Sequence, residues 1–518
     1  MQFLHPSYGF RIGLEAFRAA VIPARRALAN GAGGINDPEE GHMDFLKALF
    51  GTIDSLTWGW ALVPILIIFG LFFTLMSGFV QIEFFGRMFR VLLGRNQNAD
   101  PNAISAREAL LVSIGGRVGG GNIAGVAVAI SLGGPGAVFW MWAIALVGMA
   151  TSLVECTLAQ LYKRVEPDGS FRGGPASYIR HGLGERYQWL AAFYCICLLA
   201  AFGFGFNAFQ GNTMAGAVQD SLGINRSVSG VVITAITGLV IFGGIRRIAK
   251  AADVIVPFMA LLYIAVALVI ITIHITEVPS VITQIVRAAF GFEEAIAGGM
   301  GAAIAQGLRR GLFSNEAGLG SAPNVAATAL VRHPVSQGIT QALSVFVDTI
   351  VICTCTAMII LLGDVYVPGA ATVDGVVLTQ QSLAGHVGEW SKYVLTMAIL
   401  LFAFSSVIYN AYLGENALAA LTRSKTALIV LRVAILGVIF LGASAPSASD
   451  VFFFADPMMG LLAVVNLITI MMLFPVAIRV LDDFREQLKA GVERPVLDPA
   501  AYADLDLDRA AWSPDQWK

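Results

Sequence analysis

Charged residues are scarce in this chain. Of its 518 residues, 13% are Asp, Glu, Lys or Arg and 57% are hydrophobic, whereas about 25% of a soluble domain is charged. The formal net charge of -2 offers no basic surface to a nucleic acid. The composition therefore excludes a soluble domain and a nucleic-acid partner, and it indicates an all-α polytopic membrane protein in a lipid bilayer.

Side chains for catalysis and metal binding are also few. A membrane-embedded enzyme needs His, Asp, Glu or Ser side chains gathered at facing depths, and the six His are scattered along the chain. The five cysteines fall inside apolar segments, without the spacing or the His neighbours of a zinc site. We therefore expect neither an enzyme nor a bound cofactor.

Long hydrophobic runs make up most of the chain. Windows of about 20 apolar residues, the length that crosses a bilayer, predict about eleven spans. They lie at 57–79, 109–131, 136–162, 188–211, 228–244, 253–274, 293–308, 336–362, 391–415, 426–443 and 459–480. In the N-terminal tail, residues 1–56, the stretch 14–29 suits either an amphipathic helix on the membrane surface or a partly ordered tail.

Lys and Arg are distributed unevenly over the loops. Seventeen lie in loops that follow odd-numbered spans, against three in loops that follow even-numbered spans. Because cytoplasmic loops are enriched in Lys and Arg, we expect the odd-numbered loops and the tail 481–518 in the cytoplasm. His274 and His386 then lie on the outer side in different segments, and a His-based proton relay has no support.

The spans form two groups of five after one extra helix at 57–79. The first group covers 109–274 and the second covers 293–480, and the two start from opposite sides of the membrane. This is the 5+5 inverted repeat of the leucine-transporter fold, in which corresponding helices are interrupted at the binding site. Glycines gather in the first helix of both groups, at 115–122 and 298–301.

Each of these glycine runs predicts an unwound segment. A glycine inside a helix costs about 1 kcal/mol relative to Ala, and irregular backbone at membrane depth persists only where it lines a cavity or is buried in protein. Freed carbonyls can bind a cation, and the N-terminus of the next half-helix can hold a carboxylate. For residues 115–122 the alternative is a glycine face that packs closely on another helix.

Four blocks of sequence resemble a known family. They are GGGNIAGVAVAISLGGPGAVFWMW at 119–142, RGGPASYI at 172–179, FSNEAGLGSAP at 313–323 and FAFSSVIYNAYLGEN at 402–416. Over about residues 60–480 the chain resembles the alanine or glycine:cation symporters. The resemblance implies import of a small neutral amino acid coupled to sodium, or in some members to protons, across the inner membrane of a prokaryote.

The glycine runs and the resemblance together give the candidate site residues. For the substrate we expect Gly119, Gly121, Asn122, Gln210, Asn212, Gly299, Gly301, Ser406 and Asn410. For a sodium ion, a hard cation that prefers oxygen ligands, we expect the carbonyls of Gly115 and Val118 with the hydroxyls of Ser405 and Ser406. Hydrogen bonding between helices is the alternative role for the two serines, and also for Gln210 and Asn212.

Two features leave the substrate and the ion open. Tyr409 and Asn410 stand where the family pattern leads us to expect Gly-Trp, so a larger or more polar amino acid is the alternative substrate. Arg117 lies inside a span, at a cost of at least about 2.5–3.5 kcal/mol. It would form an ion pair with Asp348 or Glu155, bind the substrate carboxylate, or act as a fixed cation in a proton-coupled or sodium-independent transporter.

Asn315 and Glu316 belong to the FSNEAGLGSAP block, just after the span at 293–308. A carboxylate near the membrane edge can cap the next helix or pair with a nearby Arg, here Arg309 or Arg310. We expect a structural or gating role for Glu316 rather than direct contact with the substrate. The block as a whole is expected to shape the cytoplasmic side of the transport path.

Overall fold

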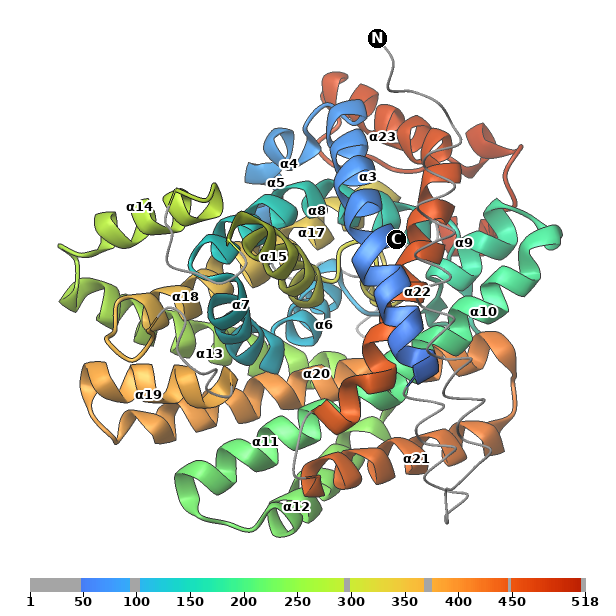
Figure 1. Cartoon of the computed structure of the whole chain (residues 1–518). Helices are drawn as coiled ribbons and strands as arrows, with labels where there is room; N and C mark the ends of the chain where they lie inside the picture. Colours follow the sequence, from blue (N-terminus) through green and yellow to red (C-terminus); the bar gives the residue numbers. More distant parts are fainter. Residues whose placement is uncertain (1–47, 94–102, 293–298, 368–374, 446–448, 514–518) are drawn as a thin grey trace, which may run out of the picture.

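The computed structural model describes residues 48–93, 103–292, 299–367, 375–445 and 449–513. The surface helix predicted at 14–29 lies outside these residues. The described chain is nearly all helical (Figure 1), and its one sheet pairs two short antiparallel strands, β1 (Arg164–Val165) and β2 (Phe171–Arg172). The predicted all-α class is confirmed.

The N-terminal half begins with the helix Ala48–Met76, which contains η1 (Thr57–Ala61) and α3 (Leu62–Met76) and corresponds to the predicted extra span. The remaining elements of this half are α4 (Val80–Glu83), α5 (Phe85–Leu93), α6 (Ala106–Arg117), η2 (Gly121–Gly125), α7 (Val126–Gly133), α8 (Gly136–Leu161), α9 (Pro175–Gly182), η3 (Glu185–Tyr187), α10 (Gln188–Leu198), η4 (Leu199–Phe206), α11 (Asn207–Leu222), α12 (Arg226–Ile241), α13 (Gly244–Ile273) and α14 (Val278–Ala289).

The C-terminal half contains a second series of helices. They are α15 (Gly299–Asn315), α16 (Ser321–Ala326), α17 (Pro334–Val345), η5 (Phe346–Cys353), α18 (Thr354–Leu361), α19 (Gly375–Val387), α20 (Ser391–Leu421), α21 (Lys425–Ser444), α22 (Ser449–Met472), α23 (Phe474–Lys489), η6 (Pro499–Tyr502) and η7 (Arg509–Trp512). The elements η1, η2, η4 and η5 are wide π-helical turns inside or beside longer helices. Such turns are frequent at functional sites.

Eight helices among the described residues are long and apolar enough to cross a membrane, and the bent pair Ala106–Arg117 and Gly121–Gly133 makes a ninth. Since α12 has 16 residues and α15 has 17, the total of eleven stays a prediction. The predicted span 459–480 has different bounds in the structure. There α22 ends at Met472, and α23 starts anew with a proline in its first turn, where a missing N–H costs no helix hydrogen bond.

The central helix of the bundle is α8, which packs on α15 and α17 (Figure 1). Small residues permit this close approach. A Cβ added at Gly311 of α15 would lie 2.5 Å from Cγ2 of Ile144, and one added at Gly338 of α17 would lie 2.7 Å from the carbonyl oxygen of Leu153. The glycines thus let the backbones of α15 and α17 lie directly against α8, as is usual for helix pairs in membranes.

The two ends of α8 identify the two ends of the molecule. At its start, a Cβ on Gly136 would lie 2.5 Å from the backbone nitrogen of Ala289 in α14. At its finish, the carbonyl of Leu161 accepts a hydrogen bond from Trp512 Nε1, at 3.2 Å. The helix α19 packs on α7 and η2, near the start of α8. We call these two sides the α19 end and the tail end.

Residues that follow α23 fold back onto the tail end. The Leu497 N–H donates to the carbonyl of Arg332, at 2.9 Å, and Asp506 forms an ion pair with Arg164, also at 2.9 Å. Part of the segment predicted as a polar tail is therefore a packed layer over the loop between α8 and α9.

Lys163 lies fully buried under this layer. Its Nζ donates to the carbonyl of Ala329, at 3.0 Å, and sits 4.1 and 4.6 Å from the ring centroids of Phe171 and Trp512. Because burial removes water from the ammonium group, it lowers the pKa of Lys163 to about 7. The two ring faces stabilise the charged form in the absence of an acidic partner among the described residues.

Candidate functional site

The first interruption lies where the sequence predicts it. α6 ends at Arg117, η2 begins at Gly121, and the two helical parts meet at an angle of 51°. The Val118 N–H closes the last turn on the carbonyl of Ile114, at 2.7 Å, and the Gly119 N–H donates to Asn122 Oδ1, at 2.9 Å. The side chain of Asn122 thereby replaces the helical partner that the break removes.

Two of the glycines at this break are required by close neighbours. A Cβ on Gly116 would collide with the ring of Tyr409, and one on Gly119 would collide with Ser406 Oγ. Both neighbours belong to α20. The first break is therefore shaped by missing side chains that let α20 approach the backbone.

The second interruption does not lie at residues 298–301, so this prediction is wrong. α15 starts at Gly299 and continues through Gly301 to Asn315, and residues 293–298 lie outside the described chain. The helix breaks at Glu316, whose φ of 53° is left-handed, and α16 restarts at Ser321. Glycines at the start of a helix interrupt nothing, because the first N–H groups of a helix have no partner within it.

Buried polar side chains hold this second break open. The backbone N–H groups of Gly318 and Gly320 donate to the carboxylate of Glu155, both at 3.2 Å. Asn466 Nδ2 donates to the Gly318 carbonyl, at 2.9 Å, and Tyr194 OH donates to the Gly320 carbonyl, at 2.8 Å. The FSNEAGLGSAP block is thus a helix that is interrupted between Asn315 and Ser321. Its expected place at the cytoplasmic side of the transport path stays a prediction.

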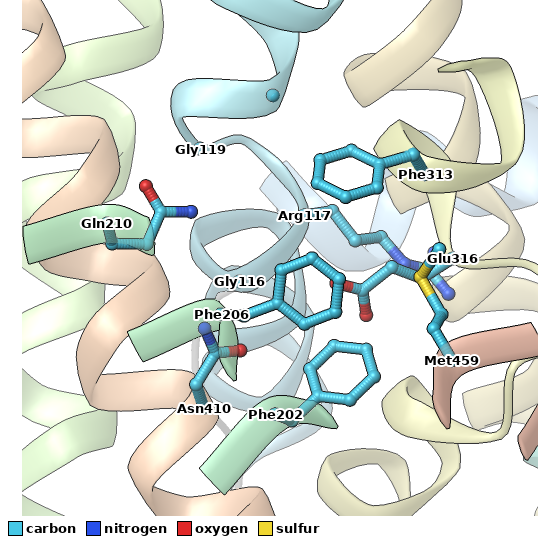
Figure 2. A pocket seen from close by; sticks show the side chains of 11 residues that line it. Gly116, Arg117, Gly119, Phe202, Phe206, Gln210, Phe313, Glu316, Asn410 and Met459 are labelled. Carbon is cyan, nitrogen blue, oxygen red and sulfur yellow. The ribbon is translucent and has the colours of Figure 1, made fainter. Parts of the chain in front are cut away.

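A pocket lies between the two interruptions (Figure 2). It is lined by Gly116, Arg117, Gly119, Gly121, Phe202, Phe206, Gln210, Phe313, Glu316, Asn410 and Met459. Gln210 and Asn410 lie on one side of it, and Arg117 and Glu316 lie on the other. The arrangement places amides opposite charges around a small space.

The apolar part of the lining is aromatic. The ring centroids of Phe202 and Phe206 are 5.0 Å apart, and those of Phe206 and Phe313 are 5.1 Å apart. Interpretation of the sequence missed these rings, although the alternation of Phe and Gly in residues 202–206 is a usable signal.

Three polar side chains of the lining have distinct partners. Gln210 Oε1 accepts from the Gly120 N–H, at 3.3 Å. Glu316 Oε2 accepts from Ser321 Oγ, at 2.5 Å, and from Tyr409 OH, at 2.9 Å. Asn410 Oδ1 is buried and has no hydrogen-bond partner within the part of the chain that the structure describes.

Arg117 is held mainly by neutral groups. It donates through Nη1 to Ser344 Oγ and to the Gln341 carbonyl, the latter at 3.3 Å, and through Nη2 to Ser152 Oγ, at 3.2 Å. Among the described residues, no carboxylate lies within 4.0 Å of it, so the predicted ion pair with Asp348 or Glu155 is absent. Because the site is buried, its charge still acts on the surrounding carboxylates, Glu155, Glu316 and Asp348.

Asp348 connects the two interrupted helices from η5. Its carboxylate accepts from Asn122 Nδ2, at 2.6 Å, from Ser314 Oγ, at 2.6 Å, and from Thr349 Oγ1, at 2.7 Å. Asn122 therefore points at Asp348 and away from the pocket lining. Its observed role is to position the first break against the end of α15.

Ser405 and Ser406 meet the carbonyls of the first broken helix. Ser405 Oγ donates to the Gly115 carbonyl, at 2.7 Å, and Ser406 Oγ donates to the Gly116 carbonyl, at 2.9 Å, and to that of Gly115, at 3.2 Å. Within the described chain, the carbonyl of Val118 receives no hydrogen bond from either serine. Four oxygens of the kind that bind sodium are gathered here.

Other predicted residues lie apart from the pocket. Asn212 Nδ2 donates to the carbonyls of Gly442 and Ala445, at 3.0 and 2.8 Å, and so ties α11 to the end of α21. Gly299 and Gly301 are exposed at the start of α15, and a Cβ on either would meet nothing within 4 Å. The predicted pairing of Glu316 with Arg309 or Arg310 is also absent, since Arg309 binds Asp54 and Asp456.

Comparison with known proteins fits this geometry. The sequence pattern described as the sodium:alanine symporter family matches residues 43–499. The chain belongs to this family. A probable sodium/glutamine symporter, GlnT, of Bacillus subtilis is 46% identical over 461 residues, which cover 89% of this chain and 94% of the relative. The sodium/alanine symporter AgcS of Methanococcus maripaludis is 37% identical over 451 residues, which cover 86% and 98% of the two chains.

A solved structure of the same fold is that of MhsT in complex with L-phenylalanine. It aligns with a TM-score of 0.50 and 13% identity, and it covers 75% of this chain and 99% of that one. At this identity the likeness concerns the fold alone, which is leucine-transporter-like. The family member described here is thus a multi-pass membrane protein, a transporter rather than a catalyst, and an amino-acid:cation symporter.

Proposed function

We propose that this symporter imports a small neutral amino acid of the alanine and glycine kind together with sodium, by alternating access at the pocket between the two breaks. The second half of the first broken helix begins at Gly121, and its N-terminal end carries partial positive charge. α15 ends at Asn315, and its C-terminal end carries partial negative charge beside Glu316. A zwitterion suits a pocket on which both ends converge.

The oxygens around Ser405 and Ser406 support sodium as the coupling ion. Sodium would take the hydroxyls and the carbonyls of Gly115 and Gly116 as ligands, with the hydroxyl protons turned away. The alternative, a fixed cation at Arg117 in a proton-coupled or sodium-independent transporter, is less favoured. Arg117 directs its hydrogen bonds to Ser152 in α8 and to Gln341 and Ser344 in α17.

An amino acid with a side-chain amide is a second candidate for the substrate. Asn410 lines the pocket with an unpaired oxygen, and a buried acceptor without a donor costs about 1–3 kcal/mol. A substrate amide N–H would supply that donor. The name of the relative GlnT, a probable sodium/glutamine symporter, agrees with this alternative.

Uptake into proteoliposomes tests the substrate and the ion together. Labelled alanine, glycine and glutamine are offered under a sodium gradient, under a proton gradient and under neither. We expect sodium-driven uptake of alanine or glycine. Glutamine as the preferred substrate, with reduced preference in an Asn410→Ala variant, would establish the amide alternative instead.

The sodium site is tested by a double variant, Ser405→Ala with Ser406→Ala. We expect its uptake to fall to the sodium-free level, because both hydroxyl ligands are gone. Ser391→Ala is the control, since it changes a serine at the start of the same helix, whose hydroxyl donates to the Gly388 carbonyl. Sodium dependence unchanged in the double variant removes the assignment.

The bias of Lys and Arg supports a cytoplasmic location of the tail end, and the prokaryotic relatives support an inner membrane. The α19 end then faces outward. This orientation defines the direction of uptake in the experiments above.

A further inference from the structure

Two histidines that are far apart in the sequence meet at the α19 end. His386 Nδ1 lies 3.0 Å from His274 Nε2. His386 Nε2 lies 2.9 Å from the carbonyl oxygen of Ile359, and His274 Nδ1 lies 3.1 Å from Oε1 of Glu277. The two histidines lie in different segments, as expected, but the fold brings their side chains into contact.

The three contacts of the two histidines need one hydrogen more than two neutral imidazole rings carry. A carbonyl oxygen only accepts, so His386 Nε2 must carry hydrogen. An ionised carboxylate also only accepts, so His274 Nδ1 must carry hydrogen. The 3.0 Å contact between the two rings needs a third hydrogen, whereas two neutral imidazoles hold two. All three hydrogen bonds exist together only if the pair carries one extra proton.

The surroundings of His386 disfavour a charge on that ring. Burial lowers the pKa of His386, and the charge of His274 acts in the same direction. Glu277 before α14 and Asp364 after α18 are the carboxylates that act on His386. Beyond α19, Glu389 and Lys392 pair with each other, at 2.6 Å.

α19 covers the second half of the first broken helix. A Cβ on Gly375 would lie 2.5 Å from the Ala124 carbonyl, and Thr379 Oγ1 donates to the Ile123 carbonyl, at 3.5 Å. Both carbonyls belong to η2. His386, at the other end of α19, ties the helix to the ends of α13 and α18.

We propose that His274 and His386 share one proton and form a pH-sensitive clasp, which holds α19 over η2 on the outer side of the pocket. The clasp concerns regulation of the transporter and so rests on the proposed function for its meaning. A second proton, on His386 Nδ1, would set an N–H against the His274 N–H and a charge against a charge. The contact would then open.

The direction of the pH effect follows from His386. Its pKa in the closed state lies below the ordinary value of about 6.5 because burial disfavours the charged ring. The contribution of the neutral His386 ring to the closed clasp is therefore lost as the pH falls through this lowered pKa. The clasp also needs the one shared proton, so the contact between the rings is lost again when the pH is high enough to remove that proton. Mild acid releases α19.

Cysteine labelling measures this release without any transport assay. In Thr379→Cys the thiol is buried between α19 and η2, and Val367→Cys supplies an exposed reference at the same end. We divide the labelling rate of Thr379→Cys by that of Val367→Cys, because this ratio cancels the effect of pH on the reactivity of a thiol. Over a pH series from about pH 8 to about pH 4.5, we expect this ratio to pass through a minimum, where the pair holds one proton. On the acid side of the minimum it should rise about tenfold, as for the loss of one charge-assisted hydrogen bond.

Variants at the clasp shift the ratio in opposite directions. His386→Ala removes the contact, so the ratio is high across the pH series. His386→Gln keeps a donor for Ile359 and an acceptor for His274 but cannot take up a second proton, so the rise on the acid side disappears. His181→Gln, at the tail end, is the control and keeps the pH profile of the parent. Buffers contain a chelator, because two imidazoles also bind transition metals.

A ratio that does not change with pH in the parent overturns the clasp, and so does an unchanged profile in His386→Ala. If Thr379→Cys does not fold, hydrogen exchange of residues 375–387 in the unaltered chain, corrected for intrinsic rates, gives the same comparison. Failure of sodium-driven uptake would remove the proposed function and leave these labelling results standing.

Discussion

The two interrupted helices reach the same pocket by different means. At the first break, glycines remove side chains, and the hydroxyls of α20 approach the freed carbonyls of Gly115 and Gly116. At the second break, a residue with a side chain, Glu316, adopts a left-handed φ of 53°, and the buried carboxylate of Glu155 receives the freed N–H groups. One break depends on space and the other on charge.

This difference predicts different responses to mutation. The first break should be sensitive to added volume and tolerant of polarity, since its contacts are to backbone. The second should be sensitive to lost charge at constant volume. Tyr409 belongs to both, because its ring faces Gly116 and its hydroxyl donates to Glu316.

Glu316→Gln should give the largest effect. The substitution keeps the volume but removes the charge that accepts from Ser321 and Tyr409 at the edge of the pocket. Hydrogen bonds to charged groups contribute about 1.5–3 kcal/mol, so we expect initial uptake to fall about 10- to 100-fold. Glu185→Gln, at an exposed position, is the control. Uptake equal to that of the parent would show that charge does not maintain the second break.

Gly116→Ala tests the first break by volume. Its Cβ would overlap the Tyr409 ring, and overpacking of this kind costs about 1–3 kcal/mol. We expect a lower midpoint of thermal unfolding in detergent and a reduced uptake rate. An unchanged midpoint would mean that α20 can move away from the break without cost.

Tyr409→Phe removes only the link between the two breaks. The ring that faces Gly116 stays, while the 2.9 Å hydrogen bond to Glu316 is lost. We expect a loss of stability of about 1 kcal/mol and a smaller fall in uptake than for Glu316→Gln. Tyr393→Phe, at an exposed position of the same helix, is the control. A loss as large as that of Glu316→Gln would contradict the separation of the two mechanisms.

Gly301→Ala should give the smallest effect. This glycine lies where a break was predicted, but the structure places it in open space within α15. Replacing a helical glycine with Ala stabilises a helix by about 0.5–1 kcal/mol, so we expect unchanged uptake and an equal or slightly higher unfolding midpoint. Loss of uptake would restore residues 298–301 to the transport path.

The first break was predictable because it results from the glycines in its own sequence. Several glycines inside an apolar span have few explanations, and the serines of α20 could be placed opposite them through the resemblance. The second break was not predictable in the same way. Glu155 accepts from the Gly318 N–H and Asn466 donates to the Gly318 carbonyl, and these two residues lie 163 and 148 positions from Gly318 along the chain. No local pattern carries such contacts.

Side-chain contacts between distant helices were the second feature that the sequence did not predict. Arg117 donates to Ser152 and Ser344, which look like ordinary small residues of apolar spans in the sequence. The His274–His386 contact depends on how α19 returns toward the end of α13. Span positions followed from hydropathy, whereas side-chain partners followed from packing that hydropathy does not encode.

The packing of Trp512 over Lys163 also has a consequence for the order in which the chain folds during synthesis. The ammonium group of Lys163 emerges at the end of α8, whereas Trp512, one of its two ring partners, is translated after every span. Until then, a chain growing into the membrane can keep this cation in water at the lipid headgroups. Closure of the tail over Lys163 would therefore be among the last steps of biogenesis. A polypeptide that stalls before residue 512 would leave the tail end of α8 without this cover.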